Sequence, residues 1–262
     1  MNFAERRPEM GKNYTRPALI TKDAVSGFCP GCAHSTIHKL IAEVIEEMHM
    51  EENTIRCLGI GCSGLGTKYL QLDYINCAHG RALAAATAVK RLNPDKLVFT
   101  YQGDGDLAAI GLAETISAAA RGENVSVIFV NNSTYGMTGG QIAPTTLVGM
   151  KATTAPLGRT VEQHGYPLHV LEMLNVLDTP AYLTRVTCST PAGVRKTKQA
   201  IRDAFTCQLE GKGFSLVEIL SNCPTNWGLS PSDSLKFIDE HTSKEFPLGE
   251  LRNRLKDRKI NL

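Results

Sequence analysis

The chain has 262 residues, which is enough for one large α/β domain or two small ones with a substantial hydrophobic core. Hydrophobic residues make up 42% and charged residues 21%, as in ordinary globular proteins, and the net charge of +2 gives no support to nucleic-acid binding. Residues 1–25 contain no apolar run typical of a signal peptide, and no stretch approaches the ~18 apolar residues of a membrane span. We therefore expect a cytoplasmic protein that binds neither nucleic acid nor membrane.

Helices and strands are predicted to alternate along the first half of the chain. Residues 1–27 predict an extended arm with little periodicity. The elements expected after the arm are a helix from about Ser35 to about His49, a strand over 54–62, an alanine-rich helix that ends before Pro94, a strand over 95–101, a helix that Gly122 ends and a strand over 125–132.

The second half begins with a Gly-, Thr- and Pro-rich stretch over 133–146, and loops of this length are usually functional. The elements expected after it are a helix over 161–166, a strand over 180–187, a helix over 194–213, a strand over 214–220 and a helix over 230–241 capped by Ser230 or Ser232.

Continuous apolar strands that alternate with helices predict a doubly wound α/β fold with a mostly parallel sheet. No linker or repeat divides the chain, so we expect a single domain over 1–262 with an N-terminal arm (about 1–27) and a charged C-terminal tail (about 242–262) that wraps or docks.

A buried strand ends in the sequence GDGD, and the next strand ends in NN. Asp104 and Asn132 therefore follow two strands that one βαβ unit separates, and both belong at the carboxyl edge of the sheet, where ligands bind in such folds. Carboxylate and amide oxygens are ligands suited to Mg²⁺, which commonly holds phosphate oxygens. Gly103 and Gly105 permit close backbone approach, and the helix that follows points its N-terminus at the anion. The pattern favours a metal–phosphate site over a plain turn.

Eight cysteines are many for an intracellular chain of this size, and they favour a metal or iron–sulfur site over disulfides. The pair Cys29 and Cys32 forms C-P-G-C, which alone fits a redox pair, a zinc half-site or a cluster half-site. Cys62 and Cys223 are expected at the carboxyl edge of the sheet, and four such thiolates suit a 4Fe–4S cluster, although zinc also accepts them. Cys57 is the main rival ligand. The other cysteines, Cys77, Cys188 and Cys207, are expected to be packed thiols.

Three longer stretches, HGRALAAATAVKR, FTYQGDGDLAAIG and VIFVNNSTYGMTGGQIAPTT, resemble the β subunits of 2-oxoacid:ferredoxin oxidoreductases. The resemblance covers roughly residues 25–235 and includes the thiamine diphosphate motif, GDG followed by NN. It implies the thiamine diphosphate-binding fold and three cofactors, which are thiamine diphosphate, Mg²⁺ and a 4Fe–4S cluster.

The resemblance also implies roles for individual residues. Asp104 and Asn132 would be side-chain ligands of Mg²⁺, and Thr134 would supply a backbone carbonyl. Residues that would frame the cofactor are Gly103, Gly105, Asp106, Thr138, Gly139, Gly140 and Gln141. His79 would lie near the cofactor in a catalytic role, and the alternative for this residue is a hydrogen-bonded structural histidine. The cluster ligands would be Cys29, Cys32, Cys62 and Cys223.

The implied reaction is the oxidative decarboxylation of a 2-oxoacid to acyl-CoA and CO₂, with electrons passed through the cluster to ferredoxin. Thiamine enzymes need a glutamate against the aminopyrimidine, and we find no second, pyrimidine-binding domain in this chain; Glu114 is expected to be structural or solvated. An α-type subunit would supply the glutamate, so the chain alone is expected to be inactive. The smaller γ and δ subunits are further partners that the resemblance allows.

The substrate is a weaker inference. Residues 62–67 contain no Arg or Lys, which favours a branched-chain 2-oxoacid over 2-oxoglutarate. Pyruvate and indolepyruvate stay open as alternatives. Two rival functions also remain, a thiamine enzyme subunit without redox chemistry and a non-catalytic nucleotide-binding or zinc-stabilised subunit.

Overall fold

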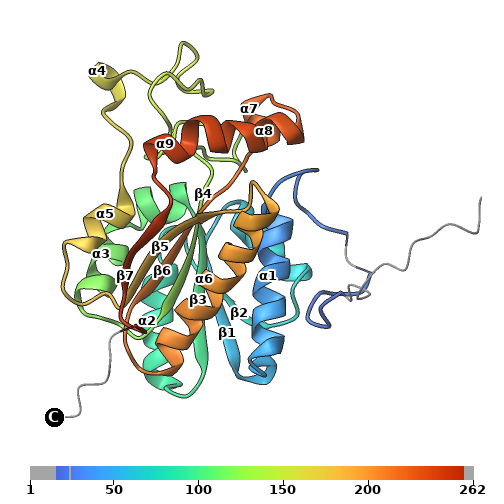
Figure 1. Ribbon diagram of the computed structural model, residues 1–262, viewed down its shortest axis with the longest axis vertical. Helices are drawn as coiled ribbons and strands as arrows, with labels where there is room; N and C mark the ends of the chain where they lie inside the picture. Colours follow the sequence, from blue (N-terminus) through green and yellow to red (C-terminus); the bar gives the residue numbers. More distant parts are fainter. Residues whose placement is uncertain (1–15, 24, 257–262) are drawn as a thin grey trace, which may run out of the picture.

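The computed structural model describes residues 16–23 and 25–256. Its centre is a seven-stranded sheet with the order β2-β1-β3-β4-β6-β5-β7 (Figure 1). The strands are β1 (Thr54–Leu58), β2 (Asp73–Asn76), β3 (Leu97–Gly103), β4 (Ser126–Asn131), β5 (Tyr182–Thr187), β6 (Ser215–Leu220) and β7 (Gly249–Asn253). All neighbouring strands pair in parallel except β5 and β7, which are antiparallel. The mostly parallel sheet is therefore confirmed.

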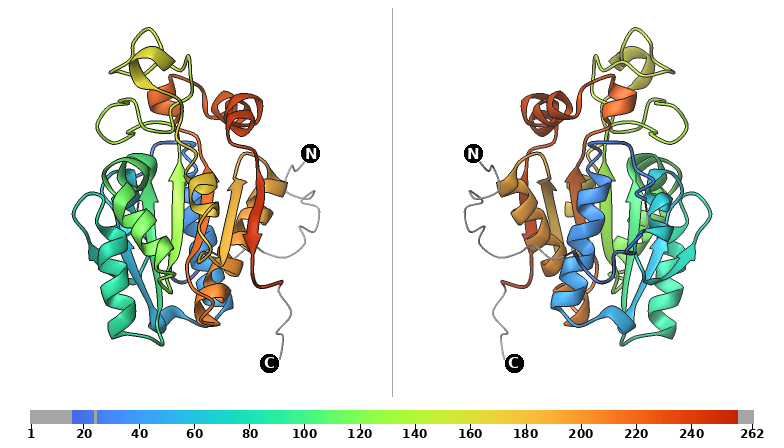
Figure 2. Two further views of the ribbon diagram at one scale, coloured as in Figure 1. Left: turned by 90° about the vertical axis from the view of Figure 1, so that its left-hand side faces the viewer. Right: turned by 90° about the vertical axis from the view of Figure 1, so that its right-hand side faces the viewer.

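Helices cover both faces of this sheet, as the views in Figure 2 show. One face carries α1 (His34–Glu47) and α6 (Pro191–Leu209), and the other carries α2 (Ala82–Leu92), α3 (Leu112–Ala120) and α5 (Val170–Asn175). The doubly wound α/β prediction is thus also confirmed.

The strands are continuously apolar because both sides of the sheet are buried. Successive side chains of a strand alternate between two hydrophobic cores. On β3, Phe99 packs in the core under α1 and α6, whereas its neighbour Val98 packs in the core under α2 and α3. Burial on both sides fixes the strand register and so fixes where each strand ends.

The carboxyl edge of the sheet is covered by short helices and a long loop, visible at the top of Figure 1. These helices are α4 (Val161–His164), α7 (Pro224–Trp227), α8 (Pro231–Phe237) and α9 (Ser243–Glu245), with the π-helical turn η4 (Ile238–Thr242) between the last two. Ser230 caps α8 and accepts a hydrogen bond from the backbone N–H of Asp233 at 3.1 Å, as its sequence position predicted.

Some local structure differs from the sequence predictions. The strand predicted over 54–62 ends at Leu58, and Cys62–Lys68 forms the 3-10 segment η2. The helix after GDGD starts as a π-helical turn, η3 (Gly105–Ile110), before α3 begins. A further 3-10 turn, η1 (Glu51–Asn53), precedes β1.

Two strands, β2 and β7, were not predicted, and β7 lies within the predicted C-terminal tail. Residues 1–15 of the predicted arm and 257–262 of the tail lie outside the described residues. In the described part of the chain, no helix has both the length and the apolar character that membrane crossing requires.

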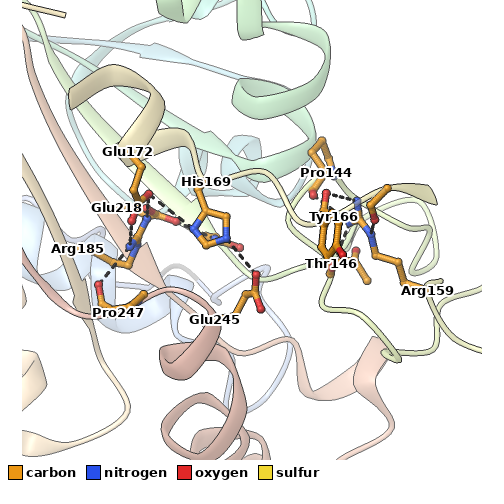
Figure 3. A network of polar contacts seen from close by, with 12 residues as sticks. Pro144, Thr146, Arg159, Tyr166, His169, Glu172, Arg185, Glu218, Glu245 and Pro247 are labelled. Carbon is orange, nitrogen blue, oxygen red and sulfur yellow. Dashed lines mark hydrogen bonds and ion pairs between the residues drawn. The ribbon is translucent and has the colours of Figure 1, made fainter. Parts of the chain in front are cut away.

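Two buried arginines stabilise the region above and beside β5 (Figure 3). Arg185 on β5 pairs with Glu218 of β6 and with Glu172 of α5, both at 2.7 Å. Arg159 donates to backbone carbonyls of the long loop, among them those of Thr146 at 2.8 Å and Tyr166 at 2.8 Å. A guanidinium has five N–H donors, so one arginine can hold several otherwise unpaired loop carbonyls.

Candidate functional site

A pocket opens at the carboxyl edge of β1, β3 and β4. It is lined by residues 60–63, 103–106 and 134–138 together with His34, His79 and Asn132. Because the sheet is parallel, the ends of these strands meet at one edge, where ligands bind in open α/β folds. The pocket therefore brings together the GDGD and NN segments and Cys62.

Asp104 lies at the end of β3 and its side chain is buried. Its Oδ1 accepts from the backbone N–H of Gly105 at 2.9 Å, and its Oδ2 accepts from the N–H of Thr134 at 3.1 Å and the hydroxyl of Thr145 at 2.7 Å. Burial raises the pKa of this carboxyl to about 6, against the opposite effect of the hydrogen bonds. No basic side chain pairs with Asp104 among the described residues, so a cation would supply the missing charge.

Asn132, at the end of β4, turns its amide toward Asp104 and Thr134. The facing end of the amide lies 3.3 Å from Asp104 Oδ1 and 2.8 Å from the carbonyl oxygen of Thr134. With the nitrogen at this end, the amide donates to both oxygens; with its oxygen there, three oxygens converge. Convergence of three oxygens is unfavourable without a cation and is what a Mg²⁺ ligand set requires. The predicted ligands are thus brought together, and they fit a hard divalent cation.

Both carboxylate oxygens of Asp106 accept hydrogen bonds from the protein itself. Its Oδ1 accepts from the backbone N–H groups of Ile60 at 3.0 Å and Gly80 at 2.9 Å, and its Oδ2 accepts from the side chain of Gln102 at 2.6 Å. His79 Nδ1 lies 2.7 Å from the same Oδ1. Asp106 therefore ties the segments after β1 and β2 to the end of β3, and it lies beside His79, whose side chain is one-third exposed in the pocket.

The two glycines of the GDGD stretch have different surroundings. A Cβ added to Gly105 would lie 2.2 Å from the ring of Tyr135, so this position is packed against protein. A Cβ added to Gly103 would meet no protein atom within 4 Å, although Gly103 lines the pocket. The space beside Gly103 therefore belongs to the pocket and is open to a ligand.

The predicted Thr138–Gln141 loop is only partly at the pocket. Thr138 lines it, whereas Gly139, Gly140 and Gln141 do not. Gln141 holds the loop closed by donating to the carbonyl of Thr138 at 2.9 Å. Gly139 and Gly140 have φ angles of 109° and 83°, which glycine adopts without strain. These three residues shape the loop that presents Thr138 and Met137.

The four predicted cluster ligands gather beside the pocket. Cys29, Cys62 and Cys223 each raise the pKa of the Cys32 thiol electrostatically, although burial is the largest cause of its rise to about 12. A Cβ on Gly136 would lie 3.2 Å from Cys62 Sγ and 3.6 Å from Cys223 Sγ, which places both thiols against the loop after β4.

The spacing of the thiols bears on the kind of metal site. Within the described ranges, no three His, Cys, Asp or Glu side chains are close enough to hold one metal ion. Zinc binds four thiolates with bonds of ~2.3 Å, and a 4Fe–4S cluster also binds four thiolates, so both kinds of site stay open for these cysteines. The rival ligand Cys57 instead lies beside the thiol of Cys77, on the side of the sheet under α2 and α3.

Several residues at the site carry no motif that sequence reasoning could use. Thr145 reaches Asp104 from the far end of the Gly-rich loop, and only the length of that loop hinted at function. His34 lines the pocket two residues after Cys32, and its Nδ1 lies 2.6 Å from the hydroxyl of Tyr101. Glu114 is paired with Arg81 and does not line the pocket, so its predicted structural role fits its position.

Comparisons with known proteins agree on one group. Residues 59–219 match a family model described as the thiamine pyrophosphate enzyme, C-terminal TPP binding domain. The chain is 45% identical over 227 residues to the ketoisovalerate oxidoreductase subunit VorA of Methanothermobacter thermautotrophicus, covering 87% of this chain and 48% of VorA. It is 38% identical over 222 residues to the 2-oxoglutarate synthase subunit KorB of Methanocaldococcus jannaschii, covering 82% of this chain and 77% of KorB.

The chain thus spans about half the length of the VorA relatives. Among solved structures, the 2-oxoglutarate:ferredoxin oxidoreductase from Magnetococcus marinus superposes with a TM-score of 0.74 at 24% identity, over 93% of this chain and 87% of that chain. That similarity shows a shared fold.

Proposed function

This chain belongs to the family of thiamine pyrophosphate-binding oxidoreductase subunits that includes VorA and KorB, and from this premise we propose that it is the cofactor-binding β subunit of a 2-oxoacid:ferredoxin oxidoreductase. The assembled enzyme would convert a 2-oxoacid and coenzyme A to acyl-CoA and CO₂. The two electrons released would pass through a 4Fe–4S cluster to ferredoxin.

The observation that carries the proposal is the meeting of Asp104, Asn132 and the Thr134 carbonyl at the carboxyl edge of the sheet. These groups would hold Mg²⁺, and the open space beside Gly103 would receive the diphosphate. Thiamine diphosphate, when bound, would supply a carbanion nucleophile for the keto carbon and a thiazolium ring as the electron sink. The chain's own contribution is to neutralise the diphosphate through the metal, to fix its position and to exclude water with the loop after β4.

Cys29, Cys32, Cys62 and Cys223 would bind the cluster as thiolates. Burial and the neighbouring thiols hold the pKa of Cys32 at about 12 and that of Cys62 at about 11, so the free thiols stay protonated at neutral pH. Iron would displace these protons, as metals do on binding cysteine. Cys62 also lines the cofactor pocket, which supports short-range electron transfer between the two sites.

The thiamine site is incomplete without partners, because no glutamate lines the pocket within the described residues. An α-type subunit would supply the glutamate for the aminopyrimidine; γ and δ subunits would extend the electron path.

A branched-chain 2-oxoacid is the favoured substrate. No Arg or Lys lines the pocket in the described part of the chain, whereas half-exposed Ile60 and Met137 do. A second carboxylate, as in 2-oxoglutarate, would find no cation here, but an aliphatic group would find apolar contacts. The two VorA relatives, named for ketoisovalerate, are 45% and 44% identical to this chain, against 38% for the KorB protein compared above.

The cofactor content of the complex, purified without oxygen, tests the function. We expect thiamine diphosphate, Mg²⁺ and about four irons with equal sulfide bound to this subunit, with absorbance near about 400 nm. Cys29→Ala should remove the iron and colour that belong to this subunit, whereas the matched change Cys207→Ala, in a buried thiol far from the four, should leave both unchanged. Thiamine without iron would instead identify a non-redox thiamine subunit, and neither cofactor would refute the proposal.

A further inference from the structure

His34 is the first residue of α1, and its imidazole lines the cofactor pocket. The ring is 2% exposed and stacks on Phe28, with centroids 5.1 Å apart and planes at 15°. Its Nδ1 lies 2.6 Å from the hydroxyl of Tyr101 on β3, and its Nε2 has no hydrogen-bond partner among the described residues. One ring nitrogen is therefore held by protein, and the other is free to serve a ligand.

The partner of Nδ1 decides which nitrogen carries the hydrogen. His34 Nδ1 and the Tyr101 hydroxyl are 2.6 Å apart, so one hydrogen lies between them and the other atom accepts it. The hydroxyl of Tyr101 is buried, and no other acceptor for its hydrogen is found in the described ranges. If Nδ1 kept its hydrogen, the tyrosine hydrogen would be left unpaired in the core, which is unfavourable. Tyr101 therefore donates to Nδ1, and the hydrogen of His34 resides on Nε2.

The backbone of His34 is fixed as well. Its carbonyl accepts from Nδ1 of His38 at 2.9 Å, and the N–H of the preceding residue, Ala33, donates to Asn222 Oδ1 at 3.0 Å. A donor whose ring and backbone are both fixed loses little entropy when it bonds a ligand.

We propose that His34 donates its Nε2–H to an oxygen of the 2-oxoacid bound in the cofactor pocket and that Tyr101 is the positioning residue that sets this tautomer. The inference rests on the function proposed above, and it assigns to this subunit a direct contact with substrate.

The tautomer can be measured without any turnover. In the full chain, prepared free of iron and labelled with ¹⁵N-histidine, the signals of His34 are identified by their absence from His34→Gln. We expect a protonated Nε2 and an unprotonated Nδ1, with a shift toward the other tautomer in Tyr101→Phe. A protonated Nδ1 in the wild-type chain would overturn the proposal.

The substrate contact is tested in the assembled complex. His34→Leu should lower kcat/KM for the 2-oxoacid about 10- to 100-fold, the effect of losing one hydrogen bond to a charged oxygen. His34→Gln, which places an amide N–H in a similar position, should recover most of this loss, and Tyr101→Phe should be intermediate. The affinity for thiamine diphosphate should stay within about twofold in all three, because the donor serves the substrate.

Two results would contradict the role of His34, namely an unchanged kcat/KM in His34→Leu or a parallel loss of thiamine affinity. Absence of thiamine binding in the wild-type complex would instead refute the proposed function, while the NMR measurement would still report the tautomer.

Discussion

The two aspartates of the GDGD stretch differ in the groups that face their carboxylate oxygens. Asp106 meets three protein donors and the His79 ring nitrogen. Asp104 faces an amide and a carbonyl that can both present oxygen to a cation. The sequence places both residues at the sheet edge, but the number of donors that separates their roles depends on segments 26 to 46 residues away.

The same substitution at these two positions should lower cofactor affinity by very different factors. Asp104→Asn removes the charge that a cation requires, and we expect the affinity for thiamine diphosphate with Mg²⁺ to fall about 100-fold or more. Asp106→Asn should cost less than about tenfold, because the amide of Gln102, whose Oε1 is buried without a partner, can turn and accept from the new amide. Calorimetric titration of each variant with thiamine diphosphate and Mg²⁺ measures the two affinities. Equal losses of affinity would contradict the assignment of Asp104 to the metal and Asp106 to the protein.

His38 makes stability depend on pH. Burial lowers the pKa of this imidazole to about 3, from about 6.5 in the unfolded chain. The unfolded state therefore binds the proton first, so His38 should cost about 1.4 kcal/mol of stability per pH unit as pH falls from 6.5 toward 3, and nothing above 6.5. Urea unfolding at pH 7 and pH 5 should show a smaller difference for His38→Gln than for the wild type. An identical difference would exclude this linkage.

At the level of elements, the central strands could be predicted and the edge strands could not. β3 to β6 are buried on both faces, so their apolar runs stand out in the sequence. All four residues of β2 are exposed, and β7 is exposed or half-buried, so neither carries an apolar pattern. The two edge strands form because a neighbouring strand offers unpaired backbone groups, which is a tertiary cause.

The ion-pair network of Figure 3 links elements that are distant in sequence. Arg185 pairs with Glu218 on β6 and Glu172 on α5, and Glu218 also accepts from Asn131, next to Asn132, which we propose as a metal ligand. The network therefore orients the end of β4 at the site.

Arg185→Met should lower the free energy of unfolding by about 3–5 kcal/mol, because it leaves a buried carboxylate unpaired. Adding Glu218→Gln should restore part of that loss. The control is Arg202→Met, which breaks the more exposed pair with Glu47 and should cost less than about 1 kcal/mol. Urea unfolding measures all three, and a loss for Arg185→Met no larger than for the control would contradict the role of the network.

Over the whole molecule, the fold brings separate stretches of chain to one edge of the sheet. The GDGD and NN segments and Cys62 meet there because parallel strands end together, so their proximity could be inferred from strand order. The presence of Thr145 and His34 at the site could not be inferred in this way, because the path of the long loop and the start of α1 depend on packing above the sheet.

Trp227 offers a direct test of the cofactor site, because it is the single tryptophan and its indole N–H donates to the carbonyl of Asn132 at 3.2 Å. Titration of the complex with thiamine diphosphate in the presence of Mg²⁺, with the partner subunits' tryptophans replaced by phenylalanine, should give a saturable change in fluorescence.

Gly103→Ala should weaken the binding of thiamine diphosphate strongly, since its Cβ enters the pocket without touching protein. Gly27→Ala, whose Cβ makes only ordinary contacts outside the pocket, is the matched control. Saturable binding that requires Mg²⁺ and is lost only in Gly103→Ala is the predicted result; no binding in the wild type, or equal binding by both variants, would contradict the account.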